Sequence, residues 1–258
     1  SGTVTGLSVG GLPDGTVDAG TVAADVATQA EIDAKLNLSG GTMTGNLNII
    51  QATSGTGSSA VKELIYNEGA GDAALHLALS GSTDWYVGAD NTDNSLKIGQ
   101  ASWDSSPYLA IDTTGAVTMP SQPAFLVKNA QLDNISVSTV TTIPYSNELF
   151  DQNSDFNTSN YTFTAPVTGK YQLNVSTYLN AVPVNAQYLQ VRIVTSNHTY
   201  STIIDPNFSA NLDYYSQNIS VLADMDANDT ADVAILQQAG TQQLDIQGSG
   251  FFSGYLVA

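Results

Sequence analysis

Few residues of this chain are suited to acid-base or nucleophilic chemistry. It has two histidines, His76 and His198, and no cysteine. A Ser-His-Asp triad needs a histidine held between a nucleophile and a carboxylate. His76 lies inside an alternating apolar run and His198 beside a turn signal, far apart in the sequence. Without cysteine, a zinc site built on thiolates is excluded as well. We therefore expect both histidines to be structural or solvated.

Carboxylates are abundant, with 24 acidic side chains against six basic ones. Two suitably spaced carboxylates are enough for glycoside hydrolysis, so a host-polysaccharide depolymerase is one alternative. The abundance gives no reason to select any pair, and no long β-helical region of the kind expected for such an enzyme is evident. We expect a protein that is not an enzyme.

Two clusters of oxygen-bearing side chains have the composition of cation sites. Residues 224–228 begin like a calcium loop, but Asp229 replaces the required glycine and Ile235 the bidentate glutamate. Residues 90–94 read Asp-Asn-Thr-Asp-Asn. Asx turns explain both clusters. We assign no cofactor and no metal; Ca2+ is the ion that such clusters would suit.

The aromatic residues Trp85, Tyr86 and Trp103 present flat apolar rings that suit stacking on sugars. Large aromatics within a strand-like run such as 85–87 are more typical of a core. We expect these three side chains to be core residues.

Composition excludes several classes of partner. The net charge of -18 would repel phosphate backbones and anionic lipid headgroups, which argues against nucleic acid and membrane. No apolar run approaches the roughly 20 residues that span a bilayer, and no export signal is visible. With 42% hydrophobic and 12% charged residues, the chain should bury an ordered core.

Residues 1–48 are expected to form a connector with one short helix. The sequence from Thr28 to Glu31 matches a capping box, and Ile32 and Leu36 follow one helical turn apart. Because a helix of about ten residues is marginal alone, this apolar stripe needs a partner, either its own chain or its symmetry mates.

The next segment favours the symmetry mates. Residues 40–45 read Gly-Gly-Thr-Met-Thr-Gly. They resemble a short element that recurs in bacteriophage tail-fibre proteins, commonly behind such a helix. The resemblance implies a homotrimeric fibre.

Residues 49–121 are expected to form a β-rich middle domain. A turn at 112–115 joins its last two apolar runs, and Pro120 and Pro123 then block helix and ladder continuation, which marks a boundary. Period-two alternation, typical of a half-buried sheet, is carried by Leu75, Leu77, Leu79, Leu96, Ile98, Leu109 and Ile111.

Residues 122–258 alternate short strands with turns, as in a sandwich or jelly roll. They resemble the C1q family in the segments 161–171 and 249–257. Leu173 and Val175 depart from the family where it usually carries aromatics. The resemblance implies a ten-strand jelly roll in a tight trimer with the chain ends at its base. The residues that fall on the family's spacings are Tyr145, Asp151, Phe156, Phe163, Gly169 and Tyr171.

The last strand supports a trimer independently. Phe251, Tyr255 and Val257 share one face, and Phe252 and Leu256 share the other. One face can meet the core of a sandwich, and the other then needs a subunit interface or a covering loop. We predict core or trimer-interface positions at Phe251, Phe252, Tyr255, Leu256, Ile32 and Leu36.

Strand counting from the carboxy terminus places three connections, about 181–186, 205–214 and 240–248, at the end remote from the base. Amides, tyrosine and phenylalanine there suit recognition of a glycan or protein, although loops are polar in general. The predicted receptor-binding residues are Val182, Pro183, Asn185, Asn207, Phe208, Asn211, Asp213, Tyr214, Thr241, Gln242 and Gln243.

Together these patterns predict an all-β trimeric fibre with a C1q-like jelly-roll head. Its expected role is host attachment as a non-catalytic receptor-binding protein at the distal end of a phage tail fibre, in the virion and at the host surface. Its partners would be two further copies of itself, upstream phage tail components and a host glycan or surface protein. The alternatives, besides a depolymerase, are a structural trimerisation or connector module of the fibre and a bacterial C1q-like adhesin.

Overall fold

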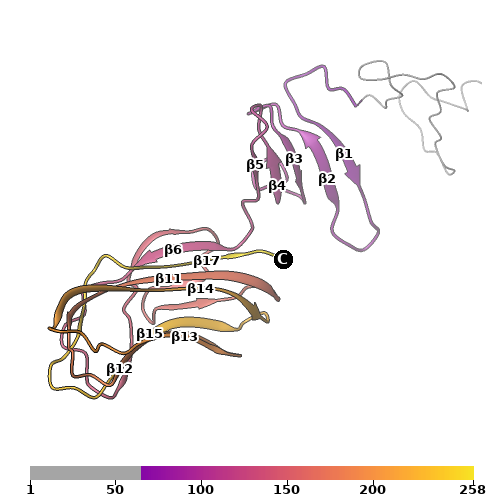
Figure 1. Ribbon diagram of the computed structural model, residues 1–258. Coiled ribbons are helices and arrows are strands. Elements are labelled where there is room, and N and C mark those ends of the chain that lie inside the picture. The colour runs from indigo at the N-terminus through magenta and orange to yellow at the C-terminus, as the bar shows by residue number, and fades with distance from the viewer. Residues whose placement is uncertain (1–64) are drawn as a thin grey trace, which may run out of the picture. The chain divides into compact units, whose positions relative to one another are not determined.

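The computed structural model describes residues 65–258 (Figure 1). The predicted helix with Ile32 and Leu36, and the Gly-Gly-Thr-Met-Thr-Gly element, lie outside the described residues. Every regular element from Ile65 onward is a β-strand, which confirms the all-β fold class. In this part of the chain no helix is long and apolar enough to cross a membrane. The domain limits at 48 and 121 stay predictions.

The first described sheet, called the middle sheet below, is an antiparallel meander with strand order β1-β2-β3-β4-β5 (Figure 1). The predicted turn at 112–115 is present. Asp112 Oδ1 accepts hydrogen bonds from the backbone N–H groups of Thr114 and Ala116, and Gly115 adopts a φ of 88°. The strands are β1 (Ala73–Leu77), β2 (Trp85–Ala89), β3 (Leu96–Gly99), β4 (Leu109–Ile111) and β5 (Val117–Thr118).

The burial of the middle sheet differs from the expectation in one respect. Trp103 is buried, as expected, and Tyr86 is half-buried, but Trp85 is exposed, so its assignment to a core is wrong for the single chain. Leu75 and Leu77 are exposed on the same face. The reason is that residues 100–107 supply the cover for this sheet, and they cover its other face.

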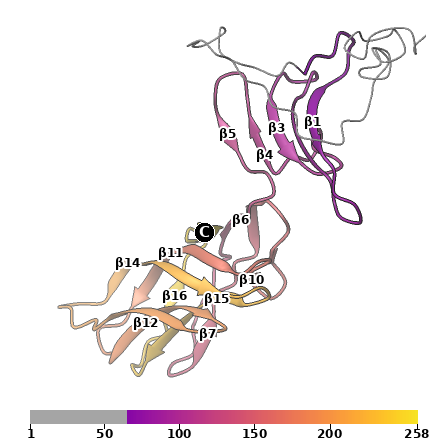
Figure 2. The ribbon, with the colours of Figure 1, turned by 90° about the vertical axis from the view of Figure 1, so that its right-hand side faces the viewer.

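The carboxy-terminal domain is a sandwich of two antiparallel sheets (Figures 1 and 2). Sheet I has the order β14-β11-β17-β6-β8, with β16 on β11, and sheet II has the order β13-β12-β15-β10-β9, with β7 on β15. Sheet I comprises β14 (Leu212–Met225), β11 (Gly169–Val182), β17 (Phe251–Leu256), β6 (Ala124–Lys128), β8 (Asn147–Asp151) and β16 (Asp245–Ile246). Sheet II comprises β13 (Thr199–Ile204), β12 (Tyr188–Thr195), β15 (Thr230–Gln238), β10 (Thr162–Thr164), β9 (Phe156–Asn157) and β7 (Val140–Thr142).

An aromatic cluster fills the space between the two sheets. The ring of Phe125 lies 4.7 Å from that of Phe163, 5.0 Å from Phe252 and 5.2 Å from Phe156, measured between centroids. All four side chains are buried. Each ring comes from a different strand, so the cluster ties both sheets together, and its close packing gives the domain one defined arrangement.

Asp151 and Gly169, the two residues without aromatic rings among those that fall on the family's spacings, have local structural roles. Asp151 accepts hydrogen bonds from the backbone N–H groups of Asp155 and Phe156 and thereby shapes the turn after β8. A Cβ on Gly169 would lie 2.6 Å from the carbonyl oxygen of Ala258, so only glycine lets the chain end pass this close. Leu173 and Val175, where aromatics are usual in the family, are buried core residues.

Two 14-residue strands, β11 and β14, define the long axis of the sandwich, which at ~3.3 Å per residue corresponds to about 45 Å. They pair from Gly169↔Met225 at one end to Val182↔Leu212 at the other. The end at Gly169 also holds the carboxy terminus, because Lys170 N–H donates to Ala258. We call this end the base and the opposite end the tip (Figure 1).

Candidate functional site

The tip brings the three predicted connections together. Asn185 Nδ2, after β11, donates to Thr241 Oγ1, after β15, over 2.7 Å. Asn211, before β14, donates from Nδ2 to Gln242 Oε1 and accepts from the backbone N–H of Val184 over 3.0 Å. These side-chain hydrogen bonds join segments that are distant in the sequence into one surface.

Two glutamines anchor this surface from below. Gln237 is fully buried at the end of β15; its Nε2 donates to the Gln242 and Ala239 carbonyls, and its Oε1 accepts from Leu244 N–H. Gln242 Nε2 donates in turn to Ala181 O over 3.1 Å. The sequence prediction missed Gln237, although a glutamine that closes the apolar run 233–236 is a usable signal, because a buried amide must be hydrogen-bonded.

A fourth connection, 129–139, also reaches the tip and was missed. Gln243 Nε2 donates to Asn134 O over 3.1 Å, and Asn134 N–H donates to Asp245 Oδ1 over 2.7 Å. The sequence gives no sign of this link, because the two segments are about 110 residues apart: the 129–139 loop follows β6, and Gln243 and Asp245 come shortly before β17.

Two of the predicted receptor contacts need correction. Val182 and Pro183 are buried, so neither offers surface to a partner. The reason is that β11 pairs with β14 as far as Val182. The strand is longer than the sequence suggests, because the alternation changes between Ala181 and Val182: Ala181 adopts a φ of 54° and is half-buried, and Val182 is buried instead.

The remaining predicted contacts fall into two groups. Asn185, Asn211, Thr241, Gln242 and Gln243 make the loop-to-loop bonds described above. In contrast, Asn207, Asp213 and Tyr214 are exposed, and within residues 65–258 their side chains make no hydrogen bond. We call these three residues the open tip cluster; Asp213 and Tyr214, as neighbours in β14, point to opposite faces of sheet I.

Two aromatic contacts position the open tip cluster. Tyr214 stacks on Tyr178 with ring centroids 5.4 Å apart and an interplanar angle of 2°. Phe208 is half-buried and packs 6.1 Å from the ring of Tyr215. Phe208 therefore supports the loop. Tyr214 pairs with Asn180, so its exposed ring lies at the tip end of sheet I, on the face that points away from sheet II.

A second candidate surface is the outer face of sheet I, which points away from sheet II. Here Tyr255, Gln172 and Leu222 form one row across β17, β11 and β14. Tyr255 and Leu222 are about half exposed, and Phe251 is also exposed on this face. The two faces of β17 thus differ: Phe252 is buried in the aromatic core, and Leu256 is half-buried against it.

Three polar side chains of this outer face, next to the row of Tyr255 and Leu222, bond to one another. Gln172 Nε2 donates to Asn174 Oδ1 over 3.1 Å and to Ser220 Oγ over 3.0 Å, and Ser220 Oγ donates to Asn174 Oδ1 over 2.8 Å. Much of the hydrogen-bonding capacity of these three side chains is satisfied internally, so covering this part of the face would leave few of their polar atoms without a partner.

Comparison with known proteins identifies the domain. The family model of the C1q domain matches residues 124–257, which is more than half of the chain. The chain belongs to the C1q family. No curated protein sequence matches it.

Two solved structures are similar to about half of this chain. The globular domain of zebrafish complement 1qA protein is 18% identical with a TM-score of 0.42, and the match covers 54% of this chain and 98% of that one. Murine APRIL, crystallised at pH 8.0, is 12% identical with a TM-score of 0.41, and the match covers 53% of this chain and 100% of that one.

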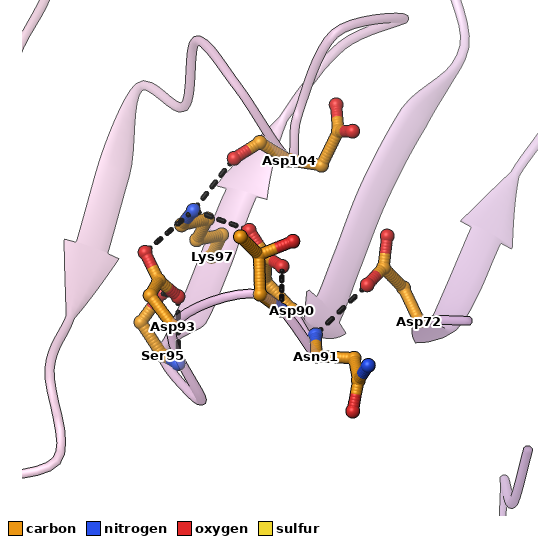
Figure 3. Close-up of polar contacts among 8 residues, drawn as sticks. Asp72, Asp90, Asn91, Asp93, Ser95, Lys97 and Asp104 are labelled. Atoms are coloured by element: carbon orange, nitrogen blue, oxygen red, sulfur yellow. Dashed lines mark hydrogen bonds and ion pairs between the residues drawn. The ribbon is translucent and has the colours of Figure 1, made fainter. Parts of the chain in front are cut away.

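Outside the C1q domain, the oxygen cluster at 90–94 surrounds the side-chain ammonium of Lys97 (Figure 3). The Lys97 ammonium lies 2.5 Å from Asp90 Oδ2 and 2.9 Å from Asp93 Oδ2, and it donates to Asp104 O over 2.6 Å. The hydrogen bond to Asp90 raises the pKa of Lys97 and lowers that of Asp90. Hydrogen bonds from Ser95 and then Lys97 lower the pKa of Asp93 to about 2.

The other oxygen cluster forms a turn at the base of the C1q domain. Asp229 Oδ2 accepts from the backbone N–H of Asp226 over 2.8 Å and from Asn197 Nδ2 over 2.6 Å. Within residues 65–258, no group of three His, Cys, Asp or Glu side chains is placed to hold a metal ion. Hydrogen bonds and ion pairs within the chain therefore explain how the side chains of both clusters are arranged.

We predict that Lys97→Met destabilises the middle sheet, because it leaves the buried Asp90 carboxylate without a counter-ion. The midpoint of thermal unfolding at neutral pH should fall by several degrees. Near-ultraviolet circular dichroism measures it, because Trp103 lies next to Asp104 and reports on the middle sheet. Since the pKa of Asp93 is depressed, its stabilisation is present above its unfolded pKa and lost as the pH falls toward about 2.

The matched control for this prediction is Lys170→Met. The Lys170–Asp224 ion pair is solvent-exposed on both sides, so its removal should leave the midpoint almost unchanged. Equal effects of the two variants would contradict a special role for the Lys97 cluster.

Proposed function

We propose that this chain is the distal, host-facing part of a bacteriophage tail fibre and attaches to the host cell surface through the tip of its C1q domain. One observation carries the proposal: three connections are tied together at the end remote from Ala258 and from the entering segment at Pro123, and they leave Asn207, Asp213 and Tyr214 open to a partner. The Gly-Gly-Thr-Met-Thr-Gly resemblance at 40–45 supports the fibre role.

The chemistry of the open tip cluster suits a host glycan or a polar protein surface. An amide and a carboxylate provide donors and acceptors, and the Tyr214 ring provides a flat apolar face for stacking. The neighbouring amides are engaged in loop-to-loop bonds, so the surface is ordered before binding, which lowers the entropy cost of recognition. No bond-breaking step is needed for this role, and we propose a non-catalytic protein.

The proposed assembly is a homotrimer formed through the part of the outer face of sheet I that carries Phe251, Tyr255 and Leu222, which leaves Tyr214 at the tip end of this face outside the interface. The exposed Phe251, Tyr255 and Leu222 side chains lie on this face around internally bonded polar groups. Burying such a face in a subunit interface removes apolar surface from water. Three tips on one particle would then bind with avidity. The base, which holds the segment entering the domain, would connect to the upstream tail components.

We predict that the double variant Asn207→Ala and Tyr214→Ala weakens adsorption of the full chain to susceptible cells at least about tenfold, because it removes a hydrogen-bonding amide and a stacking ring from each of three tips. Binding of fluorescently labelled protein to a panel of bacterial strains measures this. Both residues are exposed, so the thermal midpoint should hardly change.

The matched control is Thr199→Ala, because Thr199 is exposed on β13 near the base. This variant should bind like the unaltered chain. Unchanged adsorption by the double variant would move recognition away from the tip. Absence of saturable binding to any strain by a trimeric chain would favour a structural connector, and release of sugar from host polysaccharide would favour a depolymerase.

A further inference from the structure

One face of the middle sheet consists entirely of apolar side chains. In antiparallel strands, directly paired residues share a face. The pairs Leu75↔Val87, Val87↔Ile98 and Ile98↔Leu109 therefore form one continuous row across four strands. We call the face that carries this row the open face.

The rows on either side continue the same pattern. Leu96, Ile111 and Val117 pair across the last three strands, and Leu77 pairs with Trp85 at the other end of the sheet. Leu77 is 50% and Val117 57% exposed. No charged residue stands in these rows, so the face is a contiguous apolar patch of the kind that marks an interaction surface.

The opposite face is already covered by the chain itself. Trp103 is buried and stacks over Tyr86 with ring centroids 6.4 Å apart, and the Cα of Trp103 approaches Gly99 so closely that a Cβ there would lie 3.0 Å away. Lys97 and its carboxylates lie on this covered side. The polar residues are thus inside and the apolar ones outside, the reverse of a sheet that faces water alone.

We propose that the open face packs against the same face of two other copies of this chain, so that three middle sheets enclose one apolar core. The inference rests on the proposed homotrimer and adds a second interface to it. A chain with a net charge of -18 can meet its own copies closely only through a surface without carboxylates, and the open face is such a surface.

Chain continuity favours copies over a foreign partner. Only residues 119–123 separate β5 from β6, and Gln152 Nε2 donates to the carbonyls of Met119, Pro120 and Gln122 in this segment over 2.8–2.9 Å. A trimer of C1q domains therefore keeps three open faces at high effective concentration. In these rows the indole N–H of Trp85 is the one side-chain hydrogen-bonding group, so the face offers little with which to select a foreign partner.

The test places a photoreactive benzoylphenylalanine at position 85, on the open face, or at position 103, on the covered face, in the full chain. Irradiation at position 85 should give covalent species of two and three chains on denaturing gels, with peptide mapping locating the new bonds in residues 65–118 of another copy. At position 103 the bonds should form within one chain. Native mass spectrometry of the same samples reports whether trimers are present.

The outcomes separate the two proposals. A trimeric chain whose position 85 links only to residues of its own chain, such as Tyr108, whose ring lies 5.5 Å from that of Trp85, or to no protein residue at all, overturns the open-face interface and leaves the homotrimer standing. A native mass of one chain overturns both the homotrimer and the interface. Links from position 85 to another copy, together with intrachain links from position 103, support the inference.

Discussion

Replacing Phe252 by alanine should lower the free energy of unfolding of the C1q domain by about 3–5 kcal/mol, the cost typical of deleting a buried aromatic ring. The side chain has no exposed surface. The centroid of its ring lies 5.0, 5.8 and 6.0 Å from the ring centroids of Phe125, Tyr145 and Phe156. Since whole domains are stable by about 5–15 kcal/mol, this loss is a large fraction of the total. Denaturant unfolding of the full chain, monitored by circular dichroism, measures it.

The neighbouring Phe251 provides the matched control. It has the same side chain on the same strand but points to the other side, with 38% of its surface exposed. Phe251→Ala should cost less than about 1 kcal/mol in a monomeric domain, since it leaves no internal cavity. If both variants lose the same stability under monomeric conditions, the assignment of the two faces of β17 is wrong.

Tyr255→Glu should convert the proposed trimer into folded monomers. The side chain is about half exposed on the outer face of sheet I, next to Gln172 and in one row with Leu222. Three carboxylates introduced into an interface would be desolvated without counter-ions, which costs several kcal/mol each. Sedimentation measures the assembly, and near-ultraviolet circular dichroism verifies that the core is intact.

Ile203→Glu is the corresponding control on sheet II. Ile203 is 59% exposed on β13, in the sheet that the proposed interface does not use, so this variant should remain trimeric. A reversed result, with Ile203→Glu monomeric and Tyr255→Glu trimeric, would place the interface on sheet II. In either case the C1q fold itself is untouched, because both side chains point away from the core.

The two faces of the last strand were readable from the sequence because side chains in a strand alternate with a period of exactly two residues. The turn at 112–115 likewise follows from local chemistry, since Asp112 bonds to its own neighbours. In each of these cases the cause lies within a few residues of its effect.

The tip shows where local reasoning ends. The sequence predicts that three connections share one end, but it gives equal weight to all their amides. Only the tertiary structure separates Asn211 and Gln242, which bond loop to loop, from Asn207, which stays open. That separation depends on partners about 30 residues or more apart, whose distances no local pattern encodes.

By itself, then, the sequence determined the all-β class and the two faces of the last strand, because these rest on periodicity, while the C1q domain came from a resemblance that the family match at 124–257 confirms. The tertiary structure alone decided that Lys97 serves as the cation of the 90–94 cluster, that Val182 is buried, and which face of the middle sheet its own loop covers. The physical reason is that a period-two pattern tells which residues share a face, while the choice of the face to be covered depends on where a distant segment folds back.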